Sequence, residues 1–224
     1  MKIASLFSGG KDSIFALYLA QQQGWDITHL VTIQSQNPAS FMYHTVNIHL
    51  VEQLSQALDI PLSIARTQGE KEKELSDLEE ILKTLDVEGV VSGAIASDYQ
   101  RKRIEQICTD LNIESITPLW HQDQTSILYN QINAGFTILI VGVFAEGFDA
   151  TWLGRTLNKQ TIEEITMIQE RYGINPAGEG GEYETLVIDG PIFKQSILIE
   201  HATSVWNRDS GIYQIQKVSL KEKN

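Results

Sequence analysis

A short polar run near the start of the chain, Ser-Gly-Gly-Lys-Asp-Ser, has the composition of an anion-binding loop. An apolar run precedes it and an amphipathic run follows it, so the sequence predicts a loop between a strand and a helix. Glycines allow successive backbone N–H groups to converge beside the positive end of a helix dipole. Serines add hydroxyl groups, the lysine adds a charge, and the aspartate offers an oxygen ligand for Mg²⁺. The predicted anion site comprises Ser8, Gly9, Gly10, Lys11, Asp12 and Ser13.

The spacing of this loop separates it from two common phosphate-binding patterns. A Walker A motif requires Gly, four residues and then Gly-Lys-Ser/Thr, but here Ser5 stands at the first position and Asp12 at the last. The dinucleotide pattern Gly-x-Gly-x-x-Gly is also absent from the loop. A tight turn, with Asp12 or Ser13 capping the helix, stays open as the alternative.

The elements that must position this loop alternate regularly through the first half of the chain. Hydrophobic patterns predict strands at 2–7, 27–33, 62–67, 88–94 and 113–118, and helices at 12–24, 45–58, 70–85 and 98–111. Alternation with short links favours an α/β fold, with a parallel sheet covered by helices on both faces. Ligands of such sheets bind beyond the carboxyl ends of the strands.

The pattern changes after Pro118. A helix is predicted near 125–135, an apolar strand at 136–145 and antiparallel strands from residue 186 onward. We therefore expect a nucleotide-binding domain at 1–123 and a smaller α+β domain at 124–224. The apolar strands of the second part could pair across a two-fold axis, so a homodimer is possible.

Composition restricts the partners and the compartment. The net charge is −12 and the sequence has no long Lys/Arg run, which disfavours a broad nucleic-acid footprint. Cys108 is the single cysteine, so no disulfide framework is expected. The chain begins without a signal-peptide pattern and has no apolar stretch of about 18 residues, from which we expect a soluble cytoplasmic protein without membrane contact.

The loop resembles the pyrophosphate loop of the N-type ATP pyrophosphatases, which implies a Rossmann-like, HUP-type fold. Four further stretches narrow the resemblance: "SFMYHTVN" at 40–47, "GVVSGAIASDYQRKRIEQIC" at 89–108, "WLGR" at 152–155 and "NPAGEGGEYETLVIDGP" at 175–191. Together they are similar to the diphthamide synthetase family in its short archaeal-type form. The resemblance covers nearly the whole chain in the expected order.

The resemblance implies an ATP-dependent ligase with Mg²⁺ at Asp12. ATP would adenylate the carboxylate of diphthine, a modified histidine on translation elongation factor 2. Ammonia would then displace AMP to give the amide, after pyrophosphate has left. Lys11, Asp12 and Ser13 would act on the phosphates, and Arg155 would hold the pyrophosphate or the acceptor carboxylate, with a surface ion pair as the alternative for Arg155.

The same resemblance implies a pocket for the trimethylammonium group of diphthine, which carboxylates and aromatic faces suit. Its expected members are Trp152, Arg155, Glu179, Gly180, Gly181, Glu182, Tyr183, Glu184 and Thr185, with Glu182 essential to the reaction. A solvated acidic loop ahead of a strand is the alternative.

Adenosine is expected beside the segment that follows the second strand. Met42 and Tyr43 would flank the purine and His44 would bond to ribose or phosphate, unless His44 is structural. Ser92 and Gly93 would face the nucleotide from the end of another strand. Side chains at the start of the next helix could reach the same place: Tyr99, Gln100 and Arg101.

Three alternatives remain at this point. One is another enzyme of the superfamily, although the thiolases use paired cysteines and the lysidine-type enzymes use a basic tRNA surface. A second is the same ligase chemistry on a different small carboxylate. The third is a sensor that binds ATP without turnover, for which a second domain with an acidic loop has no evident use.

Overall fold

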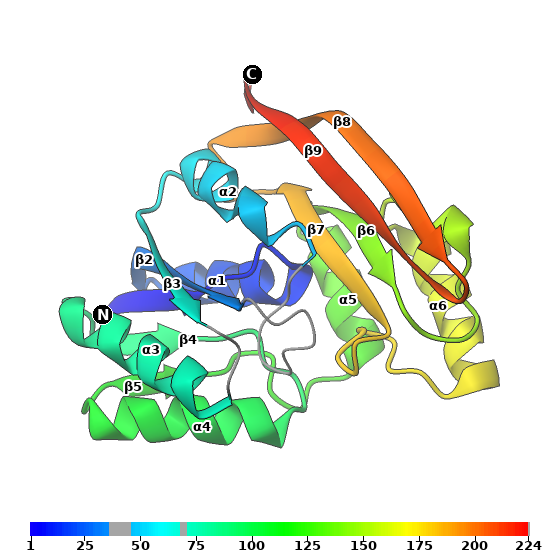
Figure 1. Cartoon of the computed structure of the whole chain (residues 1–224). Coiled ribbons are helices and arrows are strands. Elements are labelled where there is room, and N and C mark those ends of the chain that lie inside the picture. The colour runs from blue at the N-terminus through cyan, green and yellow to red at the C-terminus, as the bar shows by residue number, and fades with distance from the viewer. Residues whose placement is uncertain (36–45, 68–70, 224) are drawn as a thin grey trace. The chain divides into compact units, whose positions relative to one another are not determined.

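The computed structural model describes residues 1–35, 46–67 and 71–223 and divides into two compact units, Met1–Trp120 and His121–Asn224 (Figure 1). The adenosine contacts predicted at Met42, Tyr43 and His44 lie outside the described residues. Each unit is built around its own sheet.

The first unit contains a five-stranded parallel sheet with the strand order β3-β2-β1-β4-β5. Its elements are β1 (Lys2–Leu6), α1 (Lys11–Gln22), β2 (Asp26–Ser35), the 3₁₀ turn η1 (Ile48–Leu50), α2 (Val51–Leu58), β3 (Leu62–Thr67), α3 (Lys71–Thr84), β4 (Gly89–Val91), α4 (Asp98–Asp110) and β5 (Glu114–Ile116). The predicted helix at 45–58 is shorter than expected, because a left-handed Asn47 and a 3₁₀ turn precede α2.

The strand order explains why helices cover both faces. The chain runs outward from β1 to β3, returns past β1 and continues through β4 to β5. Right-handed crossovers therefore place α1 and α2 on one face and α3 and α4 on the other (Figure 1). This confirms the predicted Rossmann-like α/β fold. The neighbours β1 and β4 form the point where strand order reverses, and ligands of such sheets bind at that point.

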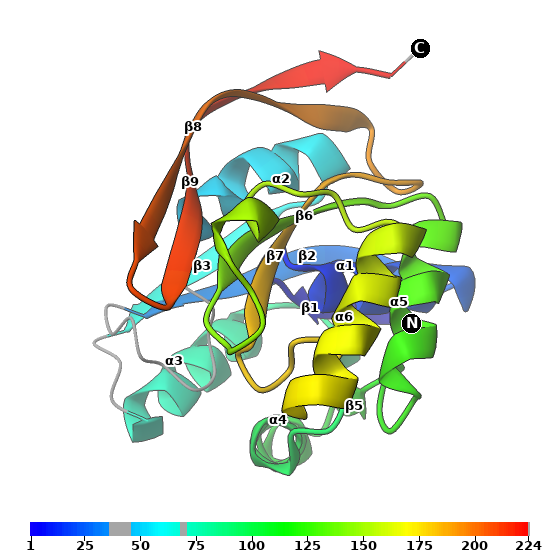
Figure 2. The ribbon, with the colours of Figure 1, turned by 90° about the vertical axis from the view of Figure 1, so that its right-hand side faces the viewer.

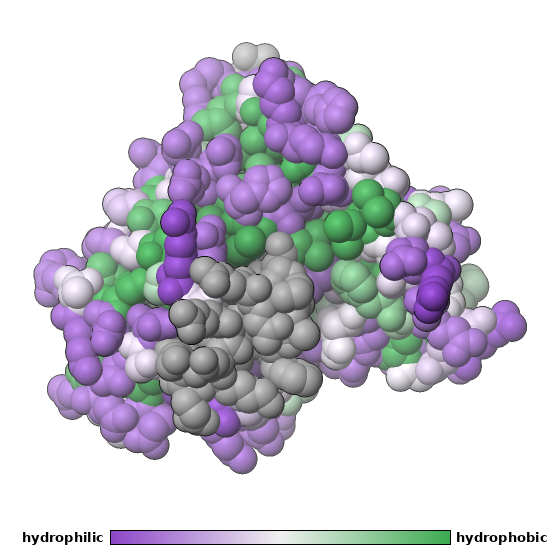
Figure 3. Space-filling model, viewed as in Figure 1, coloured by the Kyte–Doolittle hydropathy of each residue, from purple (hydrophilic) through white to green (hydrophobic). Residues whose placement is uncertain are grey.

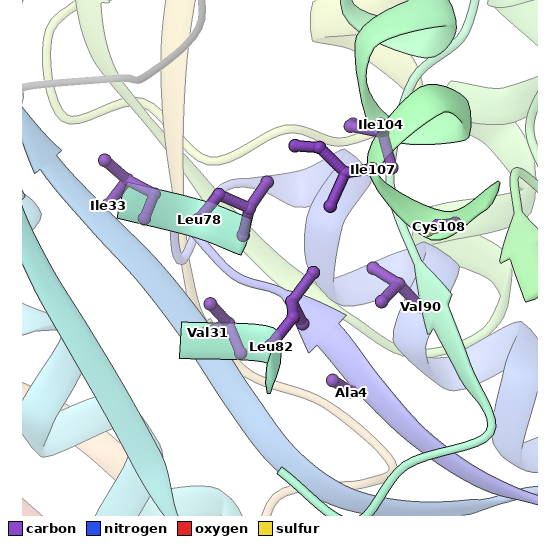
Figure 4. Packing of buried hydrophobic residues seen from close by; sticks show 9 residues of the cluster. All are labelled: Ala4, Val31, Ile33, Leu78, Leu82, Val90, Ile104, Ile107 and Cys108. Atoms are coloured by element: carbon purple, nitrogen blue, oxygen red, sulfur yellow. The ribbon is translucent and has the colours of Figure 1, made fainter. Parts of the chain in front are cut away.

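A continuous apolar cluster holds α3 and α4 against the sheet (Figure 4). Its members are buried side chains from three strands and two helices: Ala4, Val31, Ile33, Leu78, Leu82, Val90, Ile104, Ile107 and Cys108. Burial of this surface supplies the main force that fixes the strands whose ends carry the loops.

The second unit contains a four-stranded antiparallel sheet with the order β7-β6-β9-β8. Its elements are α5 (Gln124–Asn133), β6 (Thr137–Val143), the 3₁₀ turn η2 (Ala150–Trp152), α6 (Lys159–Tyr172), β7 (Tyr183–Asp189), β8 (Gln195–Asn207) and β9 (Ser210–Glu222). Strand β6 is buried beyond its first residue, and α5 and α6 lie side by side (Figure 2). The smaller α+β arrangement is as predicted, but α6 was not predicted.

On the face shown in Figure 3, hydrophilic residues (purple) cover much of the surface and hydrophobic residues (green) are visible between them. Among the described residues, the exposed large apolar side chains are Met1, Phe144, Met167, Tyr172, Leu198 and Val205. No helix in the described part of the chain has the length and apolar character needed to cross a membrane.

Candidate active site

The loop between β1 and α1 has the geometry that its glycines predict. Gly9 has a φ of 80°, a left-handed conformation that glycine adopts without strain. Gly10 is the N-cap of α1 in extended conformation. Because glycine lacks a side chain, the N-cap residue itself cannot cap the first turn, and the helix terminus retains its preference for an anion.

The two serines of the loop hold its bend together. The Ser8 and Ser13 hydroxyl oxygens lie 3.2 Å apart, and the Gly10 N–H donates to Ser8 Oγ over 3.3 Å. The Ser13 hydroxyl also donates to the Gly10 carbonyl oxygen over 3.0 Å. Ser13 is therefore a bridge across the loop rather than the N-cap considered as an alternative.

Lys11 and Asp12 form an ion pair with 2.6 Å between Nζ and Oδ2. The Lys11 side chain is only 3% exposed, whereas Asp12 is one quarter exposed. A buried lysine requires a charge partner because burial without one is costly. Asp12 supplies that partner while keeping part of its carboxylate accessible, which fits a group that would share Mg²⁺ with phosphate oxygens and water.

The loop after β4 touches the first turn of α1. A Cβ atom on Gly93 would lie 2.6 Å from the Asp12 carbonyl carbon and 2.7 Å from Ser13 N. Both contacts are with backbone, which cannot move aside as a flexible side chain does. Gly93 therefore lies against the predicted anion loop. Its contacts there are packing contacts with the backbone. Its neighbour Ser92 is 4% exposed, and its hydroxyl has no hydrogen-bond partner among the described residues.

The residues at the start of α4 interact with other residues of the first unit. Ser97 caps the helix by accepting from the Gln100 N–H. The Arg103 guanidinium lies 3.5 Å from the centre of the Tyr99 ring. Arg101 pairs with Glu105 and lies over the Trp120 ring. The predicted reach of these side chains to the nucleotide stays a prediction.

In the second unit, the predicted acidic loop is partly strand. Because β7 begins at Tyr183, both Glu184 and Thr185 belong to it. Glu182 Oε1 accepts from the Asn175 N–H at 2.8 Å and from Asn175 Nδ2 at 2.7 Å. Its other oxygen is buried and has no hydrogen-bond partner in the described part of the chain. A buried carboxylate oxygen of this kind requires an explanation.

The glycines of this loop have different environments. Gly178 and Gly181 have positive φ angles of 73° and 85°. A Cβ atom on Gly180 would lie 2.7 Å from Glu182 Oε1, so the loop folds closely over that carboxylate. Glu179, the remaining acidic residue, lies between Gly178 and Gly180 and is partly exposed.

The aromatic rings of Tyr183 and Trp152 are not exposed to solvent. Their exposed fractions are 3% and 5%, because both pack against Phe148, with ring centres 5.8 and 5.0 Å away. The Tyr183 hydroxyl donates to the Pro176 carbonyl oxygen. Both rings belong to the core of the second unit, and their predicted contact with the substrate stays a prediction.

Arg155 is held by the second unit itself. Its Nη1 lies 2.8 Å from Glu164 Oε2, and its guanidinium lies 4.2 Å from the centre of the Trp152 ring. The hydrogen bond from Arg155 lowers the pKa of the Glu164 carboxyl group. This geometry favours the ion-pair alternative, and the predicted contact with pyrophosphate or acceptor stays a prediction.

The end of β6 supplies a residue that the sequence reasoning missed. Phe144 is 44% exposed, and its N–H donates to the Glu182 carbonyl oxygen over 2.9 Å. The ring lies beside Gly142 of β6, which pairs with Glu184 of β7. Its place after a buried strand was a possible signal, but the apolar run 136–145 suggested burial throughout.

Family models match both parts of the chain. The diphthamide synthase N-terminal domain matches residues 1–115, and the diphthamide synthase C-terminal domain matches residues 123–220. The chain belongs to the diphthamide synthase family. The predicted resemblance is thereby confirmed, and with it the assignment to a family of ligases.

Relatives of this diphthamide synthase family member carry one name, diphthine–ammonia ligase. The protein from Rattus norvegicus is 32% identical, with 98% of this chain and 94% of the relative covered. The Homo sapiens protein is 33% identical, with 92% and 85% covered. The Schizosaccharomyces pombe protein is 30% identical over the whole of this chain, which spans 40% of that relative.

Among solved structures, a predicted subunit of tRNA methyltransferase from Methanocaldococcus jannaschii aligns with a TM-score of 0.46 and 17% identity. The alignment covers 88% of this chain and 99% of the other. A likeness at this level carries no argument about the activity of the diphthamide synthase family member.

Proposed function

We propose that this protein is the ATP-dependent ligase that converts diphthine on translation elongation factor 2 into diphthamide. The observation that carries the proposal is the family match over both parts of the chain, with relatives named diphthine–ammonia ligase. The anion loop of β1 and α1 supports the use of a nucleotide, because its backbone bend and helix terminus suit phosphate.

The proposed reaction has two steps. An oxygen of the acceptor carboxylate attacks the α-phosphorus of ATP, the bond to the β-phosphate oxygen breaks, and pyrophosphate leaves. The nitrogen of ammonia then attacks the carbonyl carbon of the acyl adenylate. The bond to the AMP oxygen breaks, and the nitrogen loses a proton to give a neutral amide. Both steps bring anionic groups together, so positioning and charge neutralisation carry the catalysis.

In this scheme, the loop of the first unit holds the phosphates. Lys11 supplies positive charge, the loop amides and Ser8 and Ser13 donate hydrogen bonds, and Asp12 would hold Mg²⁺. When bound, Mg²⁺ would neutralise phosphate oxygens. No group of three or more potential metal ligands occurs among the described residues. A single carboxylate that works together with substrate phosphates is the arrangement that Mg²⁺ commonly uses.

The second unit is proposed to recognise the acceptor through the loop and strand that carry Glu182 and Glu184. Glu182 is fixed by Asn175 on one oxygen, and its other oxygen lacks a partner among the described residues. That oxygen is therefore the proposed acceptor-facing atom of Glu182. Free ammonia or ammonium is the proposed nitrogen source.

The test combines the protein, Mg-ATP, ammonium and a diphthine-bearing elongation factor. We expect release of AMP and pyrophosphate, together with the mass change of amidation on the modified histidine by mass spectrometry. Products formed only with another carboxylate would assign the same chemistry to a different acceptor. Release of no AMP with any acceptor would favour a nucleotide-binding sensor, and ADP with phosphate would exclude the adenylation step.

A further inference from the structure

The exposed ring of Phe144 occupies a defined place at the end of β6. Val143 is fully buried, whereas Phe144 directly after it is 44% exposed. The Phe144 N–H continues the ladder to β7 by donating to the Glu182 carbonyl oxygen. This backbone bond fixes where the side chain leaves the sheet, so the ring projects from an ordered strand end and not from a loose loop.

Glu184 lies on the same face as this ring. Gly142 pairs with Glu184, and Phe144 is two residues beyond Gly142, so all three side-chain positions share one face of the sheet. A Cβ atom on Gly142 would lie 2.8 Å from Phe144 Cε2 and 3.2 Å from Glu184 Cβ. The ring therefore folds over Gly142 toward the stem of Glu184, and a side chain at residue 142 would displace it.

Other aromatic rings of the second unit are less suited to a cationic ligand. Trp152 and Tyr183 are buried, and Arg155 already lies over Trp152. Tyr172 is partly exposed, but the Arg171 guanidinium lies 5.1 Å from its centre. Of the two exposed aromatic side chains named above, Phe144 is the one that lies over Gly142 next to the Cβ atom of an acidic residue, Glu184.

We propose that Phe144 and Glu184 form the subsite for the quaternary ammonium group of the acceptor. The inference rests on the proposed function, which supplies a trimethylammonium group. Such a cation donates no hydrogen bonds and is attracted by an aromatic face and by a negative charge. Phe144 is accordingly a specificity-determining residue: the ring favours the methylated cation, which is less strongly hydrated than a primary ammonium group.

The first experiment compares steady-state kinetics of AMP release in four proteins: the wild type, Phe144→Leu, Phe144→Trp and the control Tyr172→Leu. We expect Phe144→Leu to raise the KM for the diphthine-bearing factor about tenfold, the scale of one cation–π contact, with the KM for ATP unchanged. Phe144→Trp should restore the KM for the factor, and Tyr172→Leu should match the wild type. An unchanged KM in Phe144→Leu would overturn the subsite while leaving the proposed ligase activity intact.

A second experiment is independent of turnover. Saturation-transfer NMR measures binding of tetramethylammonium and of the neutral isostere tert-butanol to the same proteins. We expect transfer to tetramethylammonium in the wild type and Phe144→Trp, and a several-fold weaker signal in Phe144→Leu. Equal transfer to tert-butanol, or no loss in Phe144→Leu, would overturn the subsite. Absence of AMP release from the wild type would instead contradict the proposed function, and this experiment would still decide the subsite.

Discussion

Glu182 and Asp12 each interact with a residue close to them in the sequence. These contacts decide which substitutions can test the role of each negative charge. Asp12 forms an ion pair with the buried Lys11, so a substitution of Asp12 also removes a negative charge beside a buried cation. Glu182 uses only one oxygen for Asn175. A substitution can therefore remove the charge of Glu182 while keeping the hydrogen bonds that hold the loop.

We predict that Glu182→Gln reduces amidation about 100-fold, or about 2.7 kcal/mol in the barrier, with ATP affinity changed less than about twofold. The glutamine oxygen can still accept both Asn175 N–H groups, so the loop is retained while the charge is lost. Glu182→Ala should lose amidation and also loosen the loop. Kinetics with equilibrium ATP binding checks this, and a fully active glutamine variant would show that Glu182 acts only as a loop clamp.

Gly93 provides a second test at the residue scale. A methyl group at this residue would meet the backbone of Asp12 and Ser13. We expect Gly93→Ala to weaken ATP binding at least tenfold, because the first turn of α1 must shift. The measurement is calorimetric titration with Mg-ATP.

The matched control for Gly93 is Gly24→Ala, beyond the other end of α1. Gly24 has a φ of 79° and nothing within 4 Å of its Cβ direction. This variant should lose about 1 kcal/mol of stability through backbone strain but bind ATP normally. Normal ATP binding by Gly93→Ala would contradict the positioning role.

Helix α6 shows why an element can escape sequence reasoning. Its apolar residues are sparse, and it follows a glycine-rich aromatic stretch that obscures where it begins. The signal that identifies it is local: Asn158 accepts from the Thr161 N–H, and Thr161 accepts from the Asn158 N–H, which together form a capping box. Such reciprocal caps mark helix starts in sequences.

We predict that Asn158→Ala lowers the free energy of unfolding by about 1 kcal/mol, the usual cost of losing an N-cap. Urea denaturation followed by circular dichroism is the measurement. Asn133→Ala, at an exposed residue in the last turn of α5, is the control and should change stability by less than about 0.5 kcal/mol. Equal effects of the two substitutions would show that the cap does not stabilise α6.

Helix α4 carries the pH-dependent element of the core. Burial raises the pKa of the Cys108 thiol from its ordinary value of 9.0 to about 11. The unfolded chain therefore loses this proton first as the pH rises. The contribution to stability is complete below pH 9 and is lost progressively between pH 9 and pH 11.

We expect the free energy of unfolding of the wild type to fall more steeply over this alkaline range than that of Cys108→Ala. Denaturant titrations at several pH values test this. A native thiol should also resist Ellman's reagent at pH 8 and react after unfolding. Identical pH slopes for the two proteins would contradict the role of Cys108.

At the scale of the whole molecule, the regular hydrophobic pattern predicted the parallel sheet well. Single residues that depart from that pattern were missed. Alternating apolar runs identified the parallel sheet, because burial imposes its period on every strand from β1 to β5. The same reasoning predicted strands only from residue 186 onward and so missed the strand start at Tyr183, because an acidic, glycine-rich stretch precedes it. Phe144 was missed because it directly follows an apolar strand, where burial is expected, although its own side chain is exposed. Individual side-chain directions depend on sheet register and bulges that composition does not reveal.

The burial of Cys108 has a practical consequence for labelling experiments on the two units. Since it is the chain's single cysteine and is buried at the base of α4, its thiol is poorly available to maleimide dyes. Cysteines introduced on the surface of each unit would accept fluorophores without background. Energy transfer between such labels, recorded with and without Mg-ATP, would then report the separation of the units in solution.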